Sequence, residues 1–307
     1  MAKRLLSCTP REMLALDRDG LLQAIAASEG RTIACETIGA MQPMLLNITN
    51  AELAAAQGAD LILMNLIDLQ NPSVQGLPAD VPPEAVIREV RRLSGRPVGV
   101  NLEPVPPDCT GDDPMWRMTE GRRATVDNAR RAADLGVSFI LLTGNPGTGV
   151  TTQAIAHTLA ALKAAVGDRV VLAAGKMHAS GILSEAGEHI ITPDDVDAFV
   201  QAGADIVLFP APGTVPGITT EYIHARIAQA HRAGALSMTS IGTSQEGADV
   251  DTIRRIALAC KMAGADIHHL GDTGYAGMAL PENIFAYSVA VRGVRHTYRR
   301  MAMSLGR

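Results

Sequence analysis

Short apolar runs alternate with longer amphipathic segments along the whole chain. Each run is rich in aliphatic and β-branched residues, and the segments between the runs carry apolar residues at helical spacing. Continuous apolar runs of this length are typical of parallel strands that are buried on both faces. The predicted strands cover residues 32–37, 61–65, 97–102, 139–143, 170–174, 206–209, 235–239 and 267–270.

A short repeat stands immediately before four of these runs. It reads Gly-Ala-Asp at residues 58–60, 203–205 and 264–266, and Gly-Val-Ser at 136–138. Glycine at this position is expected to close a helix in a left-handed cap, so that the next residues start a strand. Together with four further runs of the same kind, the repeat predicts an α/β chain folded as a closed (β/α)8 TIM barrel.

Two helices within residues 1–30 are expected before the first strand, and the first begins at the capping box Thr9-Pro10-Arg11-Glu12. We expect them to plug or flank the N-terminal end of the barrel. A long helix over about residues 281–304 forms most of the C-terminal segment 281–307. No stretch has the composition of a linker, so residues 1–307 are predicted to form one domain. The other predicted helices cover residues 51–57, 83–93, 122–135, 152–165, 194–202, 221–233 and 251–263.

A doubly wound open sheet is the alternative fold. Such a sheet carries a glycine-rich nucleotide-binding turn after its first strand. Residues 38–42, which follow the first predicted strand, lack that glycine spacing. The pattern therefore favours the barrel.

The composition excludes some classes of partner. A net charge of −5 and an aromatic content of 3% argue against nucleic-acid binding. No apolar run reaches the length of about 18 residues that a membrane span needs, and no signal peptide is recognised at the N-terminus. The four cysteines form no Cys-x-x-Cys pair, which is typical of reduced thiols and predicts a cytoplasmic protein.

Polar residues follow the predicted strands, at the end where barrels carry their chemistry. The candidate catalytic residues are Glu36, Glu103, Lys176, His178 and His269. The candidate substrate- or phosphate-binding residues are Asn65, Asn101, Thr143, Asn145, Gly147, Thr243, Ser244, Asp272 and Gly274.

Two carboxylates and a lysine carry most of the expected chemistry. Glu36 and Glu103 are predicted to act as acid and base or to bind Mg2+ or Mn2+, unless one of them only pairs with Lys176. Lys176 is expected to bind an anion or to form a Schiff base, and the alternative is a plain surface lysine. His178 is its candidate proton-transfer partner, or else a structural histidine.

The adjacent His268 and His269 lie on one predicted strand, so their side chains point to opposite faces. Only one of them can face the barrel interior, and its nearness to the C-terminal end of the strand favours His269. No two histidines stand at the spacing of zinc ligands on one face, which argues against zinc.

Three glycine-rich loops are candidate anion sites. Residues 143–151 nearly match the phosphate-binding P-loop, but Val150 stands where that loop has its lysine, so nucleotide hydrolysis is not expected. A tight structural turn is the alternative. Residues 241–247 and 271–277 form the loops after the last two strands, and barrels usually bind phosphate in these loops. Glu246 and Asp272 argue against an anion directly beside them.

The C-terminal stretch 292–300 is basic. Cations favour a helix C-terminus, so a solvated helix end is the first interpretation. The alternative is a subunit interface, which agrees with an expected homo-oligomer.

From the second to the fifth predicted strand the chain resembles the BtpA-like barrel family of photosystem I biogenesis. The resemblance covers about half the chain, through residues 58–62, 97–101 and 139–144, and implies a (β/α)8 fold. The chain is also similar to uncharacterised bacterial barrels with a phosphonomutase-like label. Gly175-Lys176-Met177-His178 resembles a loop of the phosphoenolpyruvate mutase and isocitrate lyase superfamily, but that loop's cysteine is missing here.

We therefore expect an enzyme that acts on a small anionic metabolite, phosphorylated or carboxylated, by lyase, aldolase or isomerase chemistry. A barrel of BtpA type that binds a metabolite or assists assembly without turnover is the second hypothesis. A metal-dependent hydrolase is the third.

Overall fold

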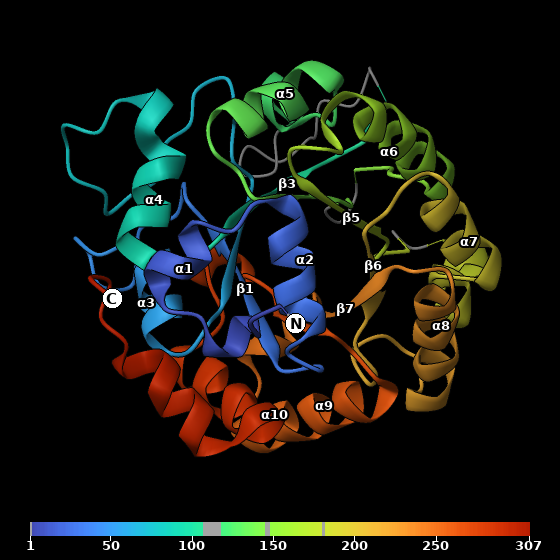
Figure 1. Ribbon diagram of the computed structural model, residues 1–307. Coiled ribbons are helices and arrows are strands. Elements are labelled where there is room, and N and C mark those ends of the chain that lie inside the picture. Colours follow the sequence, from blue (N-terminus) through green and yellow to red (C-terminus); the bar gives the residue numbers. More distant parts are fainter. Residues whose placement is uncertain (1, 107–117, 145–147, 180–181) are drawn as a thin grey trace.

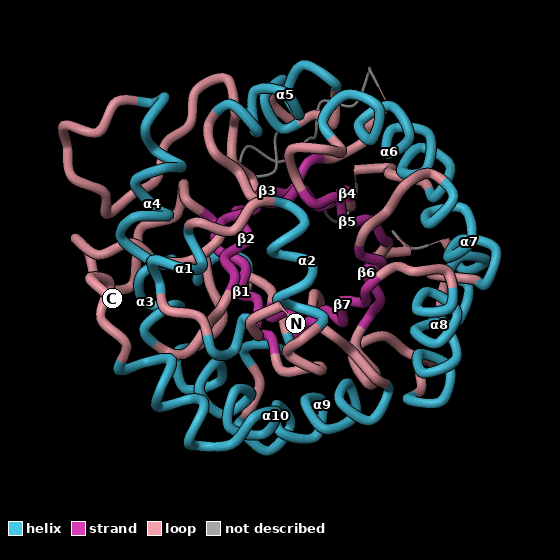
Figure 2. The backbone as a smooth tube through the Cα atoms, in the orientation of Figure 1, coloured by secondary structure: helices cyan, strands magenta, loops and turns pink. Residues whose placement is uncertain are grey.

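The computed structural model describes residues 2–106, 118–144, 148–179 and 182–307. Eight parallel strands close into a barrel in sequence order, and helices surround it (Figures 1 and 2). This confirms the (β/α)8 TIM barrel. The strands are β1 (Thr32–Ile38), β2 (Leu61–Asn65), β3 (Val98–Leu102), β4 (Phe139–Leu142), β5 (Val171–Gly175), β6 (Ile206–Pro210), β7 (Leu236–Ile241) and β8 (Ile267–Leu270).

The α-helices of the described residues are α1 (Pro10–Leu14), α2 (Arg18–Ala26), α3 (Asn50–Ala56), α4 (Val86–Ser94), α5 (Val126–Asp134), α6 (Thr152–Val166), α7 (Pro193–Gln201), α8 (Thr220–Arg232), α9 (Val250–Ala263) and α10 (Pro281–Ala302). Short 3-10 helices are η1 (Leu5–Ser7), η2 (Pro83–Ala85), η3 (Glu120–Arg122), η4 (Leu183–Glu185), η5 (Gly187–Ile190), η6 (Gln245–Gly247) and η7 (Gly274–Ala276). None of the described helices is both long and apolar enough to span a bilayer.

One predicted helix is divided in the structure. Within the predicted helix 122–135, the short helix η3 ends at Arg122 and helix α5 begins only at Val126. The reason is local. Arg123 forms a parallel bridge with Glu103, and the Thr125 side chain accepts a hydrogen bond from Asn128 N and so caps α5.

The N-terminal helices close one end of the barrel, as expected. The capping box between Thr9 and Glu12 starts α1. Leu21, Ala24 and Ile25 of α2 pack into the inner core of the barrel, and Figure 1 shows α2 crossing in front of the ring of strands. The opposite end, where the strands finish, is therefore the one available for a site.

Strand alternation sorts side chains into an inner and an outer core. On β2, Leu63 packs inside the barrel, whereas Ile62 and Met64 pack against the surrounding helices. Position 99 of β3 has room only for glycine. A Cβ atom at this position would lie 2.2 Å from the ring of Phe139, which fills the space across the neighbouring strand.

The repeat before the strands has two physical roles. Its glycines have positive φ values of 113°, 91°, 103° and 97° at positions 58, 136, 203 and 264, as a left-handed helix cap requires. The aspartates then join strands. Asp60 accepts a hydrogen bond from Ile33 N, Asp205 from Leu172 N and Asp266 from Ser237 N. Each aspartate therefore ties the start of its own strand to a neighbouring strand.

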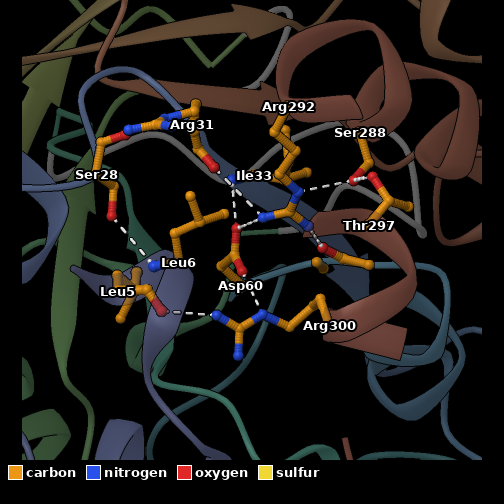
Figure 3. A network of polar contacts seen from close by, with 12 residues as sticks. Leu5, Leu6, Ser28, Arg31, Ile33, Asp60, Ser288, Arg292, Thr297 and Arg300 are labelled. Carbon is orange, nitrogen blue, oxygen red and sulfur yellow. Dashed lines mark hydrogen bonds and ion pairs between the residues drawn. The ribbon is translucent and has the colours of Figure 1, made fainter. Parts of the chain in front are cut away.

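Asp60 is also the centre of a buried ion network (Figure 3). It pairs with Arg292 and, at 2.7 Å, with Arg300 Nε, both from α10. Arg300 also donates to the carbonyl oxygens of Leu5 and Cys8. Although burial raises the pKa of Asp60, the charges of Arg292 and Arg300 hold it below its usual value. The network joins both ends of the chain to the barrel.

The expectation of a solvated basic helix end is therefore wrong for two of its arginines. Arg292 and Arg300 are 6% and 2% exposed. Gly293, with φ of 73°, interrupts α10 between them and lets both side chains reach Asp60. Arg295 and Arg299 are exposed, in agreement with the sequence pattern.

Replacing Asp60 with Asn leaves two buried arginines without a carboxylate. We expect the free energy of unfolding to fall by about 3–5 kcal/mol, as measured by urea denaturation at pH 7. Asp134→Asn is the matched control, because Asp134 pairs with Arg169 on the surface, where such a pair contributes little. An equally small effect of both variants would show that the Asp60 network does not hold α10 in place.

Candidate active site

A cavity of about 170 Å³ lies at the C-terminal ends of the strands. Part of its wall is formed by side chains at the strand ends that alternation points towards the inside of the barrel. Loop residues form the rest of the wall. The described residues that line it are Glu36, Asn65, Asn101, Leu141, Thr143, Gly144, Met177, His178, Leu208, Ser240, Gly242, Ser244, Glu246, His269, Gly271, Asp272 and Gly274.

Glu36 of β1 and His269 of β8 form the closest acid–base pair of the cavity. His269 Nε2 lies 3.7 Å from Glu36 Oε2, and their side chains are 3% and 13% exposed. On the other side of the imidazole ring, Nδ1 is hydrogen-bonded to Ser240 Oγ of β7 at 2.7 Å. Ser240 therefore fixes the orientation of the ring, with Nε2 towards Glu36.

His268 has the opposite orientation. Its ring is fully buried and contacts Tyr287 Oη of α10 and the carbonyl oxygen of Gly30. Alternation thus places His269 in the cavity and His268 under a helix, as the sequence predicts.

A chain of amide and carboxyl groups crosses the cavity wall. Asn101 Nδ2 donates to Asn65 Oδ1, and Asn65 Nδ2 donates to Asp272 Oδ2, each at 3.0 Å. Gly274 N donates to the other carboxyl oxygen of Asp272 at 2.9 Å. These bonds link the ends of β2 and β3 to the loop after β8.

Glu246 reaches the cavity from the loop after β7. Its Oε1 accepts a hydrogen bond from Thr273 N at 2.8 Å. Asn283 of α10 donates to the Glu246 carbonyl oxygen, also at 2.8 Å, and so holds the loop. Only 2% of Glu246 is exposed.

The ionisable groups of the cavity are shifted towards their neutral forms. Burial, and then the nearby charges of Asp272, Glu246 and Glu103, raise the pKa of Glu36 well above its usual value. Burial raises the pKa of Glu246 to about 7 and also raises that of Asp272. Burial lowers the pKa of His269 to about 4 and lowers that of His178. These shifts favour a protonated carboxyl group at Glu36 beside a neutral imidazole at His269.

Several buried polar atoms of the wall have no hydrogen-bond partner. Buried polar atoms in proteins are nearly always paired, so such atoms on one cavity indicate a polar ligand. Among the described residues that line the cavity, four carry such an atom: Asn101 (Oδ1), Thr143 (Oγ1), Glu246 (Oε2) and His269 (Nε2). Hydroxyl and N–H groups of a ligand suit this set.

Two of the expected catalytic residues point elsewhere. Lys176 follows the inward Gly175, and strand alternation turns its side chain outwards to pair with Glu185. Glu103 is 1% exposed and pairs with Arg122 instead of lining the cavity. Neither Glu36 nor Glu103 pairs with Lys176. The alternative interpretation, an ion pair between one of these two residues and Lys176, is therefore wrong.

The remaining expected residues divide into three groups. His178, Asn65, Asn101, Thr143, Ser244, Asp272 and Gly274 line the cavity with Glu36 and His269. Thr243 is on the exposed rim, where its hydroxyl donates to Thr214 O. Asn145 and Gly147 lie outside the described residues.

The expected metal pair does not form a ligand set. Glu36 lines the cavity and Glu103 is held by Arg122. In the part of the chain that the structure describes, no group of three or more His, Cys, Asp or Glu side chains is arranged to hold a metal ion. Binding of Mg2+ or Mn2+ stays a prediction.

Sequence reasoning gave no catalytic or binding role to Ser240 or Glu246, although Ser240 belongs to the polar residues that follow the predicted strands. Both were visible, since Ser240 continues the inner face of a predicted strand and Glu246 lies in the loop after it. The apolar part of the wall, Leu141, Met177 and Leu208, was also missed. Phe139 points into the barrel beside Gly99. Because every second side chain of a strand points the same way, Leu141 could have been predicted to point inwards as well.

Solved structures share the fold. The Schiff base forming fructose-1,6-bisphosphate aldolase has a TM-score of 0.55 and 15% sequence identity, over 86% of this chain and 96% of the aldolase chain. The endo-beta-1,4-mannanase of Thermotoga petrophila has a TM-score of 0.53 and 11% identity, over 88% of this chain and 79% of the mannanase chain. At these identities the similarity shows the barrel alone.

Relatives by sequence share a shorter segment. Proteins of Escherichia coli and Shigella boydii with the name "Putative N-acetylmannosamine-6-phosphate 2-epimerase" are 35% identical over 89 residues. The match covers 29% of this chain and 33% of each relative, so the chain spans about a third of the length of these curated relatives. A family model described as "Domain of unknown function (DUF7916)" matches residues 6–307. The chain therefore belongs to the DUF7916 family.

Proposed function

We propose that this protein is an enzyme of lyase or isomerase type that shifts protons on a hydroxylated carbonyl compound, namely a sugar or sugar phosphate. The observation that carries the proposal is the Glu36–His269 pair, whose facing atoms are 3.7 Å apart. The pair lies on a cavity wall with further unpaired polar atoms. This is the arrangement that general acid–base catalysis needs.

The pair works as a neutral acid and a neutral base. With Nδ1–H donating to Ser240, His269 Nε2 offers a lone pair to the cavity. Nε2 takes the proton from the carbon next to the substrate carbonyl, while the Glu36 carboxyl group gives its proton to the carbonyl oxygen. The product of this step is an enediol, and the imidazolium and carboxylate left behind neutralise each other.

The second half of the reaction decides the class. Delivery of a proton to the same carbon by a donor on the other face gives an epimer, and return of the proton by His269 to the adjacent carbon gives an isomer. Cleavage or formation of a carbon–carbon bond at the enediol gives an aldolase reaction. We assign the substrate hydroxyl groups to Asn101 Oδ1 and Thr143 Oγ1, which are unpaired atoms of residues that line the cavity.

The comparisons support a sugar substrate at a coarse level. The epimerase name carried by the matching proteins describes a phosphosugar and a change at one carbon, which is proton-transfer chemistry. The similar segment is 89 residues long, so the substrate of those proteins is not transferred to this chain. A metabolite-binding barrel without turnover does not need an acid beside a base.

The pair can be tested before the substrate is known. We expect the protein to exchange a carbon-bound proton of at least one sugar or sugar phosphate for deuterium in D2O, followed by NMR. Glu36→Gln and His269→Asn should each lower the exchange rate about 10²–10⁴-fold. Exchange at the wild-type rate in both variants would remove these residues from the mechanism.

Lys176 provides a test of the alternative Schiff-base route. Because Lys176 is bound to Glu185 outside the cavity, we expect Lys176→Gln to keep the exchange rate within about 3-fold, well below the effect of losing an acid or base. Borohydride trapping with keto and aldehyde metabolites should leave Lys176 unmodified in the peptide mass spectrum. A borohydride-stabilised adduct at Lys176 would contradict the mechanism above.

The raised pKa of Glu246 links stability to pH. From pH 4.5 to about 7 the folded state holds the Glu246 proton and the unfolded state releases it. The contribution of this group to stability is therefore full below pH 4.5 and is lost as the pH rises through 7. Relative to Glu246→Gln, the free energy of unfolding of the wild type should fall by roughly 3 kcal/mol over this range, as urea denaturation measures. Parallel pH profiles of the two proteins would show that Glu246 titrates normally.

A further inference from the structure

The charge of the cavity indicates the chemistry of its ligand. Its ionisable side chains, among the described residues, are three carboxyl groups and two histidines, without lysine or arginine. The lysines of the chain bind elsewhere: Lys3 to Glu12, Lys163 to Asp205, Lys176 to Glu185 and Lys261 to Val291 O. A phosphate or carboxylate inside the cavity would meet carboxyl groups and, among the lining residues that the structure describes, no lysine or arginine.

In the two loops expected to cradle phosphate, several backbone N–H groups donate to acceptors of the protein itself. Thr273 N donates to Glu246 and Gly274 N donates to Asp272. Gly271 N and Gly247 N donate to backbone carbonyl oxygens. Carboxyl groups of the protein therefore occupy positions where barrels of this architecture often bind phosphate oxygens.

Glu246 and Asp272 face the same part of the cavity. Thr273, the residue next to Asp272, holds Oε1 of Glu246, and the two carboxyl groups are close enough for their charges to interact. The second oxygen of Glu246 is buried and unpaired, and it belongs to a residue that lines the cavity. A hydrogen-bond donor with a positive charge satisfies this oxygen and favours the ionised forms of the two carboxyl groups, which burial alone disfavours.

We propose, on the basis of the function proposed above, that Glu246 and Asp272 bind the protonated amino group of the substrate, which is an amino sugar or another aminated polyol. An ammonium group has three donors and no acceptor, and it matches a wall on which carboxyl oxygens gather. The carbonyl end of the same molecule then lies towards Glu36 and His269, on the neighbouring part of the wall.

A metal ion is the other cation that carboxylates bind. Mg2+ demands near-octahedral coordination by oxygen atoms. The described residues offer no group of three side chains arranged for a metal, whereas an ammonium group makes fewer demands on geometry. Titration with Mg2+ and Mn2+ alone is therefore one arm of the test.

The test is isothermal titration calorimetry at pH 7 with matched sugars. Glucosamine and mannosamine are compared with their N-acetyl forms and with glucose and mannose, each with and without a 6-phosphate. Acetylation removes the charge and keeps the nitrogen. We expect at least one free amine to bind 10-fold or more tightly than its N-acetyl and parent forms. Glu246→Gln should reduce that preference about 10-fold.

Glu185→Gln is the matched control, because Glu185 is a carboxylate outside the cavity, and it should keep the preference for the amine. A thermal melt shows that each variant is folded. Equal or tighter binding of the N-acetyl sugars, or no binding of any free amine, would overturn the inference. Binding of Mg2+ or Mn2+ that is lost in Glu246→Gln would assign the carboxyl groups to a metal and overturn it as well.

The outcomes separate this inference from the proposed function. Deuterium exchange that depends on Glu36, together with no preference for an amine, leaves the proton-transfer function and removes the ammonium site. A preference for an amine that depends on Glu246, without exchange in any bound sugar, leaves the ammonium site and removes the proton-transfer function.

Discussion

The closure of eight parallel strands imposes one constraint on every residue of the barrel: side chains alternate between the axis and the helices. The alternation fills the interior with residues such as Leu63 and Phe139. At the ends of the strands it brings Glu36, Asn101 and His269 onto one wall. The same constraint turns His268 and Lys176 outwards. The site is therefore a consequence of register, since a shift of one residue would exchange the two sets.

Buried carboxyl groups have opposite roles at the two ends of the barrel. Near the N-terminal ends of the strands, Asp60 meets Arg292 and Arg300, stays ionised and joins helix α10 to the strands. At the C-terminal ends, Glu36 and Glu246 have no such partners among the described residues of the wall, and burial favours their protonated forms. Pairing makes the first group structural, and its absence leaves the second group available for the proton transfer and ligand binding proposed above.

The sequence predicted the barrel almost completely, because glycine caps and apolar runs are local signals. Strands β2 and β8 have the predicted bounds, and the predicted capping box at Thr9 is formed. The site was predicted in part. Strand alternation identified His269, but Glu103 and Lys176 pair with Arg122 and Glu185, which lie in the short helices η3 and η4 that the sequence pattern did not predict. Likewise, burial of Arg300 depends on the break at Gly293.

The central claim is that a protonated carboxyl group stands beside a neutral imidazole in the cavity. It is tested most directly by NMR titration of the protein with 13C-labelled glutamate carboxyl groups, in which the Glu36 signal is assigned by its loss in Glu36→Gln. The account predicts that this signal titrates well above the ordinary pKa of a glutamate, 4.5. A midpoint near 4.5 would mean that Glu36 is ionised at neutral pH and would contradict the proposed acid.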